Sequence, residues 1–221
     1  MNVKIATAGV FALVLAGCSG QAAGTVSEVS SVPTKEVKIE AGKAVPSLYS
    51  SPYSFEYPDH VRGIYVTGPT VSVKRFDELL ELVDTTELNS MVIDIKDDFG
   101  KLQYQPEKGS PFEKIGGPYI KNPDEMMKKL EEKQIYPIAR VVVFKDNHLA
   151  STRPELSFTE NGQVWKNGRG ESFVNPFMKE VWEYNVEIAK EAEKMGFKEI
   201  QFDYVRFPEG FETKDETLKY S

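Results

Sequence analysis

The alternation of short apolar segments with longer amphipathic ones, which begins near residue 60, is the feature that most constrains how this chain can fold. Four short apolar segments are predicted β-strands: 61–67, 90–96, 135–144 and 199–207. The segments between them carry apolar residues at helical spacing or begin with helix-start signals. Because strands that alternate with helices pair in parallel, the pattern predicts an α/β domain whose sheet is covered by helices.

The ends of the predicted helices carry recognisable signals. Ser72 is expected to cap a helix over 73–84. Two Asn-Pro pairs place a capping side chain before a proline at the first helical position and predict the next two helix starts: Asn122-Pro123 and Asn175-Pro176. The first of these helices is expected to run to about residue 134. The second is expected to end at Met195, because Gly196 follows as a stop.

Two parallel architectures fit this pattern, a doubly wound open sheet and a (β/α) barrel. The open sheet often has a glycine-rich phosphate-binding turn after its first strand, but here Gly68-Pro69-Thr70 matches neither G-x-G-x-x-G nor G-x-x-x-x-G-K-[ST]. The sequence therefore favours the barrel. A whole barrel takes about 250 residues, so we expect only about the first four βα units here, which is half a barrel.

The N-terminal segment has the pattern of an exported lipoprotein. A short basic start and an apolar run end at Leu15-Ala16-Gly17-Cys18, which matches a lipobox and predicts a signal peptide over 1–18 with lipid attached to Cys18. Residues 19–57 are poor in periodic apolar residues and are expected to form a disordered tether. The folded domain is then expected over 58–221, on the extracytoplasmic side of the cell membrane.

Composition excludes several classes of function. The formal net charge of -7 and the pI near 5.1 argue against a nucleic-acid partner, which requires Lys and Arg to neutralise phosphates. A single cysteine excludes an internal disulfide and a cysteine-based zinc cluster. Neither His60 nor His148 has the spacing of a metal ligand, and we expect no metal and no cofactor.

Charged residues fall on the strand faces that point into the predicted barrel. Because side chains alternate along a strand, Asp94 and Lys96 share one face of the second strand, and Gln201 and Asp203 share one face of the fourth. Arg140 of the third strand and Tyr65 of the first are expected to join them. Such a cluster is either a structural ion-pair network that fills the barrel or a functional site at the ends of the strands. If it is a functional site, Asp94 and Asp203 are the candidate catalytic carboxylates.

Two long loops follow the second and third strands and carry aromatic side chains. The first spans 97–121 with Phe99, Tyr104, Phe112 and Tyr119, and the second spans 145–174 with His148, Phe158, Trp165 and Phe173. In the second loop, Asn161-Gly162 predicts a hairpin turn. The aromatic residues either stack on sugar rings, with Trp165 as a candidate, or form small satellite cores.

The segment Ile200-Gln201-Phe202-Asp203-Tyr204-Val205-Arg206-Phe207-Pro208 resembles a family of glycoside-hydrolase-like domains of bacterial envelope proteins, which is distantly similar to alpha-amylase-type barrels. Further blocks of the same family are found in order at 61–67, 92–97 and 174–177. The resemblance implies a TIM-barrel-type fold that acts on a polysaccharide. It also implies a nucleophilic carboxylate at Asp203.

This chain departs from the alpha-amylase pattern beside that carboxylate. The pattern has an arginine two residues before the nucleophile, where Gln201 stands here, whereas Arg206 lies three residues after Asp203. The resemblance also implies an acid from a later strand, which this sequence lacks. The sequence therefore predicts a lipid-anchored glycoside hydrolase of the cell envelope, with Arg140, Lys96, Arg206, Gln201, Tyr65 and Trp165 as substrate-binding candidates. A non-catalytic glycan-binding lipoprotein and a degraded fragment are the alternatives.

Overall fold

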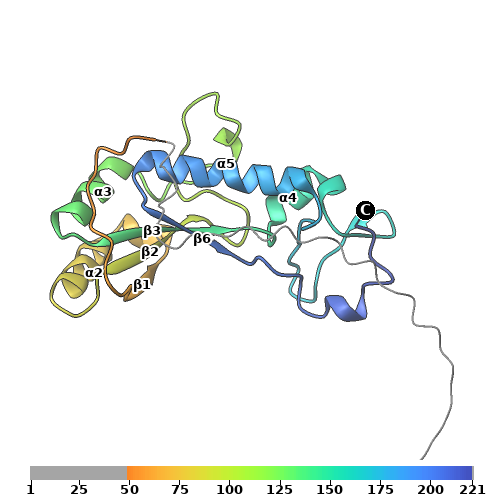
Figure 1. Ribbon diagram of the computed structural model, residues 1–221. Helices are drawn as coiled ribbons and strands as arrows, with labels where there is room; N and C mark the ends of the chain where they lie inside the picture. Colours follow the sequence, from red (N-terminus) through yellow and green to blue (C-terminus); the bar gives the residue numbers. More distant parts are fainter. Residues whose placement is uncertain (1–48, 221) are drawn as a thin grey trace, which may run out of the picture. The chain divides into compact units, whose positions relative to one another are not determined.

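A four-stranded parallel sheet organises the protein, as the computed structural model shows for residues 49–220 (Figure 1). Its strands follow the order β1 (Gly63–Val66), β2 (Ser90–Lys96), β3 (Tyr136–Val142) and β6 (Glu199–Asp203). The predicted strands are therefore confirmed, although β1, β3 and β6 are shorter than expected. Cys18, the signal peptide and residues 19–48 of the expected tether lie outside the described residues.

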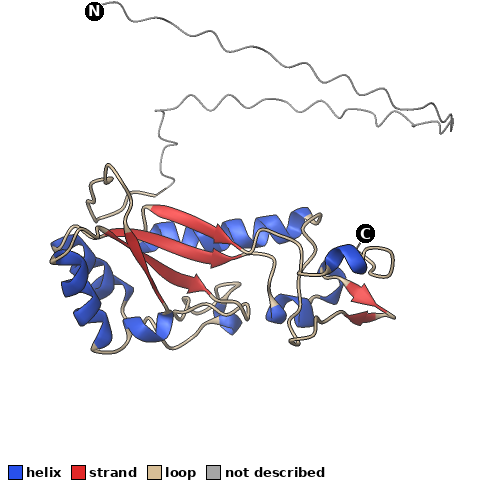
Figure 2. Cartoon of the chain, turned by 90° about the horizontal axis from the view of Figure 1, so that it is seen from below, coloured by secondary structure: helices blue, strands red, loops and turns tan. Residues whose placement is uncertain are grey.

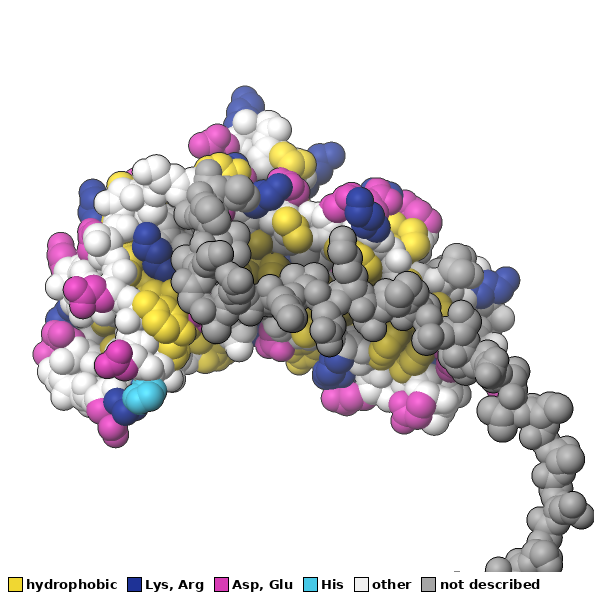
Figure 3. Space-filling model, viewed as in Figure 1, with side chains coloured by type: hydrophobic (Ala, Val, Ile, Leu, Met, Phe, Trp, Pro, Cys, Tyr) yellow, Lys and Arg dark blue, Asp and Glu magenta, His cyan; other side chains and the backbone are white. Residues whose placement is uncertain are grey.

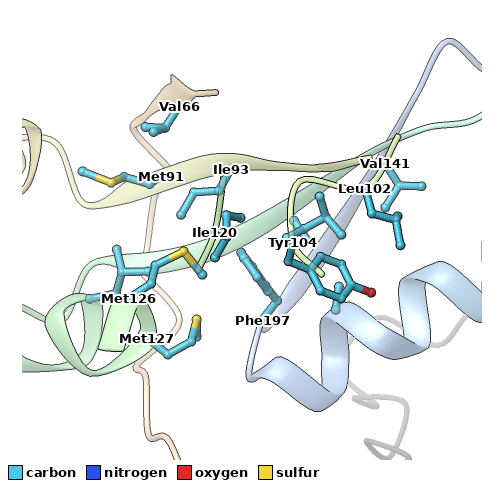
Figure 4. Close-up of a cluster of buried hydrophobic side chains, with 14 of the residues drawn as sticks. Val66, Met91, Ile93, Leu102, Tyr104, Ile120, Met126, Met127, Val141 and Phe197 are labelled. Carbon is cyan, nitrogen blue, oxygen red and sulfur yellow. The ribbon is translucent and has the colours of Figure 1, made fainter. Parts of the chain in front are cut away.

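Three helices pack against one face of this sheet: α2 (Arg75–Asp84), α3 (Pro123–Glu132) and α5 (Lys179–Met195). They enclose the main core with the alternate residues of β2 that the sequence assigned to the helix side, Met91, Ile93 and Ile95. Figure 4 shows Met126 and Met127 of α3 reaching toward this cluster. The polar residues of the four strands gather on the opposite face of the sheet.

The helix ends agree with the sequence prediction in part. Asn122 caps α3 by accepting a hydrogen bond from the amide of Glu125 at 3.1 Å. Gly196 ends α5 in the left-handed conformation, with φ of 112°. The prediction for Ser72 is wrong, because a short helix α1 (Gly68–Val71) ends there and the hydroxyl donates to the carbonyl of Tyr119 instead. The helix start predicted at Asn175-Pro176 is wrong as well, because α5 begins only at Lys179, with Met178 as its N-cap.

The predicted boundary between tether and domain at residue 58 is placed too late. Tyr53 is only 8% exposed and belongs to the main core. Its hydroxyl donates to Asp124 of α3 at 3.1 Å, and the amide of Ser54 donates to Glu131 at 2.6 Å. The apolar ring and these two contacts hold residues 53–54 against α3, so this part of the expected tether belongs to the folded unit.

The segment between β3 and α5 forms a small structure of its own. After α4 (Asn147–Thr152), strands β4 (Thr159–Glu160) and β5 (Gln163–Val164) pair antiparallel across the predicted Asn161-Gly162 turn. The C-terminal residues lie beside this hairpin (Figure 2), where Thr159 and Lys219 exchange backbone hydrogen bonds. The short 3₁₀ turns are η1 (Glu113–Ile115), η2 (Pro154–Leu156) and η3 (Phe211–Thr213).

The outer strands of the main sheet keep free edges. Within residues 49–220, β1 pairs only with β2, and β6 pairs only with β3. Phe202 of β6 is 42% exposed and Trp182 of α5 is 51% exposed. Figure 3 shows hydrophobic surface between the charged side chains on the face in view. Across the described part of the chain, no helix combines the length and the apolar character that spanning a bilayer demands.

Candidate functional site

A pocket of about 820 Å³ opens on the sheet face opposite α2, α3 and α5, toward the carboxyl ends of the strands. Each of the four parallel strands contributes to its wall through Tyr65, Asp94, Arg140, Gln201 and Asp203. Pro69 of α1 and six loop residues complete the rim, the latter being Asp97, Asp98, Phe99, Gln103, Tyr119 and Lys145. Parity along the strands therefore placed these five strand residues correctly.

Arg140 lies at the centre of the polar residues and holds three aspartates. Its NH1 group donates to Asp94 at 2.7 Å, its Nε donates to Asp203 at 2.7 Å, and its NH2 group reaches Asp98 at 3.3 Å. The register of the sheet explains the first two contacts. Asp94 lies directly beside Arg140 on β2, and Asp203 lies on the same face of β6 as Gln201, the residue directly beside Arg140. One guanidinium with several fixed donors thus fixes the carboxylates of β2 and β6 relative to each other.

The two strand carboxylates have opposite electrostatic environments. Burial raises the pKa of Asp94, and hydrogen bonds from Tyr65 and Arg140 offset that rise only in part. Burial also opposes ionisation of Asp203, but hydrogen bonds from Arg140 and the amide of Tyr204 outweigh it and lower the pKa of Asp203. Carboxylates with separated pKa values in one pocket can divide acid and base roles.

A second cation extends this network beyond Arg140. Lys145, on the loop that follows β3, contacts Asp98 at 3.1 Å and Glu171 at 2.7 Å. The hydrogen bond from Lys145 is the main cause that lowers the pKa of Glu171 to about 2. Sequence reasoning missed Asp98, Lys145 and Glu171 because they lie on loops, although the first two directly follow the ends of strands.

The backbone immediately after Asp203 is held in an unusual conformation. Tyr204 has φ of 53°, a left-handed value that a non-glycine residue adopts only under constraint. Its amide donates back to Asp203 at 2.7 Å. The centre of its ring lies 4.9 Å from the Nζ of Lys145 and 5.0 Å from the Cζ of Arg206. The attraction between the ring and these two cations therefore stabilises the left-handed conformation of Tyr204.

The aromatic residues of the two long loops divide between pocket and core. Phe99 and Tyr119 of the first loop line the pocket and are 64% and 38% exposed. Tyr104 and Phe112 of the same loop are buried in the main core. In the second loop, Phe158, Trp165 and Phe173 form a satellite core with Leu218. Trp165 does not line the pocket and is only 8% exposed, so its prediction as a sugar-stacking residue is wrong.

Lys96 also lies away from the pocket, in contrast to the prediction from parity. The pairing of β2 with β3 shifts between Asp94 and Lys96, so that Ile95 is an extra residue and Lys96 lies opposite Val141 on the helix side. There Lys96 forms an ion pair of 2.6 Å with Asp146, with both side chains fully buried, and donates to Asn185 of α5 at 3.0 Å. Lys96 is therefore a structural residue.

Arg206 is not among the pocket-lining residues either. It contacts the ring of Tyr204 and Glu209, at 3.3 Å from the latter, outside the pocket. Within residues 49–220, no group of three or more His, Cys, Asp or Glu side chains is arranged to hold a metal ion. The aspartates of the pocket instead surround arginine and lysine, so the chemistry that this site offers is that of carboxylates, a phenol and fixed cations.

A parallel sheet with helices on one face, and polar residues from every strand at its carboxyl ends, defines a βα-barrel-type domain with a carboxylate site. The chain belongs to the family described as "Putative glycosyl hydrolase domain", which matches residues 63–221. This result confirms the resemblance that the strand blocks indicated. A comparison with curated proteins found no match.

Solved structures agree with this assignment. The crystal structure of a hypothetical protein from Ruminiclostridium thermocellum is similar with 36% sequence identity and a TM-score of 0.64, over 72% of this chain and 81% of that chain. A GH20 exo-β-N-acetylglucosaminidase from Vibrio harveyi is similar in fold, with 16% identity and a TM-score of 0.51, over 75% of this chain and 29% of that chain. The partial TIM-barrel-type fold is thereby confirmed, as a sheet of four parallel strands that does not close into a barrel within residues 49–220.

Proposed function

We propose that this domain hydrolyses a polysaccharide of the cell envelope and that Asp203 is the carboxylate that faces the developing positive charge on the sugar. The observation that carries the proposal is the pairing of Asp203 with Arg140 at the pocket wall, in a domain of a glycosyl hydrolase family. Glycoside hydrolysis passes through an oxocarbenium-like transition state, which an ionised carboxylate stabilises as nucleophile or by charge. The lowered pKa of Asp203 keeps it ionised in neutral solution.

Glycoside hydrolysis also requires a proton for the leaving oxygen. Asp94 is the carboxyl of the pair whose pKa is raised, chiefly by burial. The hydroxyl of Tyr65 hydrogen-bonds to Asp94, and Tyr65 is 53% exposed where it lines the pocket. The proposed acid is therefore the Asp94–Tyr65 pair. When Asp94 is protonated, its hydrogen bond with Tyr65 reverses: the phenol O–H passes to the glycosidic oxygen, and the carboxyl proton of Asp94 replaces it on the phenol, which leaves Asp94 as a carboxylate.

The aromatic side chains at the rim support a sugar as the ligand. Phe99 and Tyr119 present exposed rings at the pocket, as sugar binding by stacking requires. Gln201 adds an amide that can hydrogen-bond to hydroxyl groups of the sugar.

The test compares Asp203→Asn with Asp84→Asn, a substitution of an exposed aspartate outside the pocket. Both full-length proteins are incubated with a panel of cell-wall and capsular glycans, and released reducing ends are measured. We expect Asp203→Asn to lower the rate by about 10²–10³-fold, because it removes a group that stabilises charge in the transition state, and Asp84→Asn to leave the rate unchanged. Equal rates for the two variants would exclude the role of Asp203.

A non-catalytic glycan-binding protein is the second candidate, and one observation favours it. Every carboxylate oxygen of Asp94 and Asp203 already accepts a hydrogen bond, from Tyr65, Arg140 or the amide of Tyr204. Carboxylates engaged in this way can serve to fix Arg140 as a binding group. Glycan binding measured by calorimetry, without turnover of any glycan by the unsubstituted protein, would support this alternative.

The proposed location is the outer face of the cell membrane, through lipid on Cys18. Support comes from the sequence Leu15-Ala16-Gly17-Cys18 after an apolar run. A single acyl chain binds membranes only marginally, so stable anchoring requires more than one. We expect Cys18→Ser to abolish incorporation of labelled fatty acid and to release the protein from the membrane fraction of a bacterial host. Unchanged labelling would contradict the proposal.

A further inference from the structure

A second hollow borders the candidate active site and shares one wall with it. This second pocket has a volume of about 320 Å³ and lies between the start of α2 and the start of α3. Tyr119 lines both pockets. The carbonyl of Tyr119 accepts a hydrogen bond of 2.7 Å from Ser72, which fixes the backbone of the shared wall. A chain that lies across the ring of Tyr119 can therefore occupy both pockets at once.

The cations of the two pockets differ in what they bind. In the first pocket, Arg140 and Lys145 are both surrounded by carboxylates of this chain. In the second pocket, Lys129 is similarly engaged, at 2.9 Å from Asp77 and 3.6 Å from Glu125. These cations have little capacity left for a negatively charged ligand.

Lys74 and Lys121 are the exception. Both line the second pocket, both are exposed, and neither forms an ion pair within residues 49–220. The side chain of Asn122 beside them is turned inward to cap α3 through the amide of Glu125. The rim of the second pocket thus offers two unpaired positive charges next to a half-exposed aromatic ring.

We propose that the second pocket binds an acidic residue of the same glycan chain whose neighbouring residues occupy the first pocket. This inference rests on the proposed function and narrows its substrate to a polyanionic glycan that is cleaved within the chain. The ring of Tyr119 supports the sugar between the two pockets, and Lys74 and Lys121 bind its carboxylate or phosphate group. A neutral glycan gains the contact with Tyr119 but not the contact with the lysines.

The test measures binding of the full-length Asp203→Asn protein to a glycan array with three arms. The first holds uronic-acid oligosaccharides, the second holds the same oligosaccharides after reduction of their carboxyl groups, and the third holds phosphodiester-linked polyol chains. Lys74→Met/Lys121→Met is compared with Lys108→Met/Lys128→Met, which removes the same charge from exposed lysines outside both pockets. The first two arms isolate the carboxylate, and the third identifies a phosphate.

We expect the Lys74→Met/Lys121→Met protein to bind the acidic arm about tenfold more weakly at low salt and to bind the carboxyl-reduced arm unchanged. In roughly 0.5 M salt the two double variants should become equal, because screening removes the attraction between exposed charges. Equal binding of the acidic arm by both double variants at low salt would overturn the second pocket as an acidic subsite. If hydrolysis still depends on Asp203 in that case, the proposed function stands without the acidic subsite. If the protein neither binds nor hydrolyses any glycan, both the proposed function and the acidic subsite are excluded.

Discussion

Two ion-pair networks begin two residues apart on β2, and only one of them faces the pocket. Asp94 belongs to the open network around Arg140, in which Asp203 is 41% exposed as a side chain. Lys96 belongs to the closed network with Asp146, where both side chains are fully buried. The same strand therefore supplies a carboxylate to a candidate active site and an ammonium group to the core.

The difference between the networks arises from the backbone. The extra residue at Ile95 reverses the alternation, so Lys96 turns toward α5 and away from the pocket. There its charge meets one buried carboxylate and the oxygens of Val142 and Asn185. A closed network of this kind serves packing, whereas an open network that holds several carboxylates around one cation can respond to a ligand. Substitutions in each should separate stability from binding.

The largest expected effect is that of Lys96→Met. Removal of the ammonium group leaves Asp146 buried without its cation, which costs about 3–5 kcal/mol of unfolding free energy. Urea unfolding followed by circular dichroism measures this loss. Lys96→Met/Asp146→Asn should recover part of it, since the remaining buried charge is removed. A loss below about 1 kcal/mol for Lys96→Met would mean that the closed network does not stabilise the fold.

Arg140→Met should have a smaller effect on stability and a stronger effect on its pH dependence. Without the guanidinium, Asp94, Asp98 and Asp203 face one another, and we expect a loss of about 2–3 kcal/mol at neutral pH. In the unsubstituted protein the lowered pKa of Asp203 stabilises the fold above the unfolded pKa, and this contribution is lost as pH falls through the folded pKa. The difference between the two proteins should therefore shrink in acid.

Denaturant unfolding at several pH values measures this prediction. Burial already raises the pKa of Asp94, and the loss of Arg140 raises it further, so the variant should gain stability as its carboxyls become protonated. The Arg140→Met protein should also bind glycan more weakly than the unsubstituted protein. A difference in unfolding free energy that stays constant between neutral and acidic pH would show that Arg140 acts through packing alone.

Substitution of Glu171, at the outer end of the open network, should have a smaller effect on the unfolding free energy, and this effect should change over a narrower pH range. Its pKa lies at about 2, against an ordinary value of 4.5, mainly because Lys145 donates to it. Its stabilising contribution is thus present above pH 4.5 and is lost as pH falls toward 2. We expect Glu171→Gln to cost about 1–2 kcal/mol at neutral pH and to be nearly neutral at pH 2. Parallel stability curves for the two proteins in acid would contradict this.

The parts of the site that sequence reasoning predicted are those that strand alternation controls. Asp94, Arg140 and Asp203 lie on adjacent parallel strands at matching faces, so period-two parity brings them together without knowledge of the loops. The resemblance of the fourth-strand segment to a known family further supported the prediction that Asp203 belongs to the site. The same rule failed at Lys96, because an extra residue in a strand leaves no local signal in the apolar pattern.

The loops could not be predicted in this way. Phe99 and Trp165 are both large aromatic residues on long loops, yet one is exposed at the pocket and the other is buried in a satellite core. Tertiary packing decides between these outcomes, including contacts with Leu218 and other residues near the end of the chain. Asp98 and Lys145 had an available signal, because both closely follow strand ends where barrel enzymes place their polar groups.

Tyr204 gives the smallest expected effect on stability and the sharpest test of how the open network is held. Tyr204→Phe keeps the ring beside Lys145 and Arg206, and it should change the unfolding free energy by less than about 0.5 kcal/mol. Tyr204→Ala loses about 1 kcal/mol of cation–π attraction, but release of the left-handed backbone offsets part of that loss.

The two variants should differ clearly in the titration of Asp203. With the ring removed, the turn loses its contacts with Lys145 and Arg206, and the amide of residue 204 is directed less firmly at the carboxylate, so the pKa of Asp203 should rise in Tyr204→Ala and stay low in Tyr204→Phe. Carbon-13 NMR of the labelled aspartate carboxyls measures this directly, and the acidic limb of the activity profile should move to higher pH with it. If Asp203 titrates equally in both variants, the ring does not position the carboxylate, and Arg140 alone keeps it ionised.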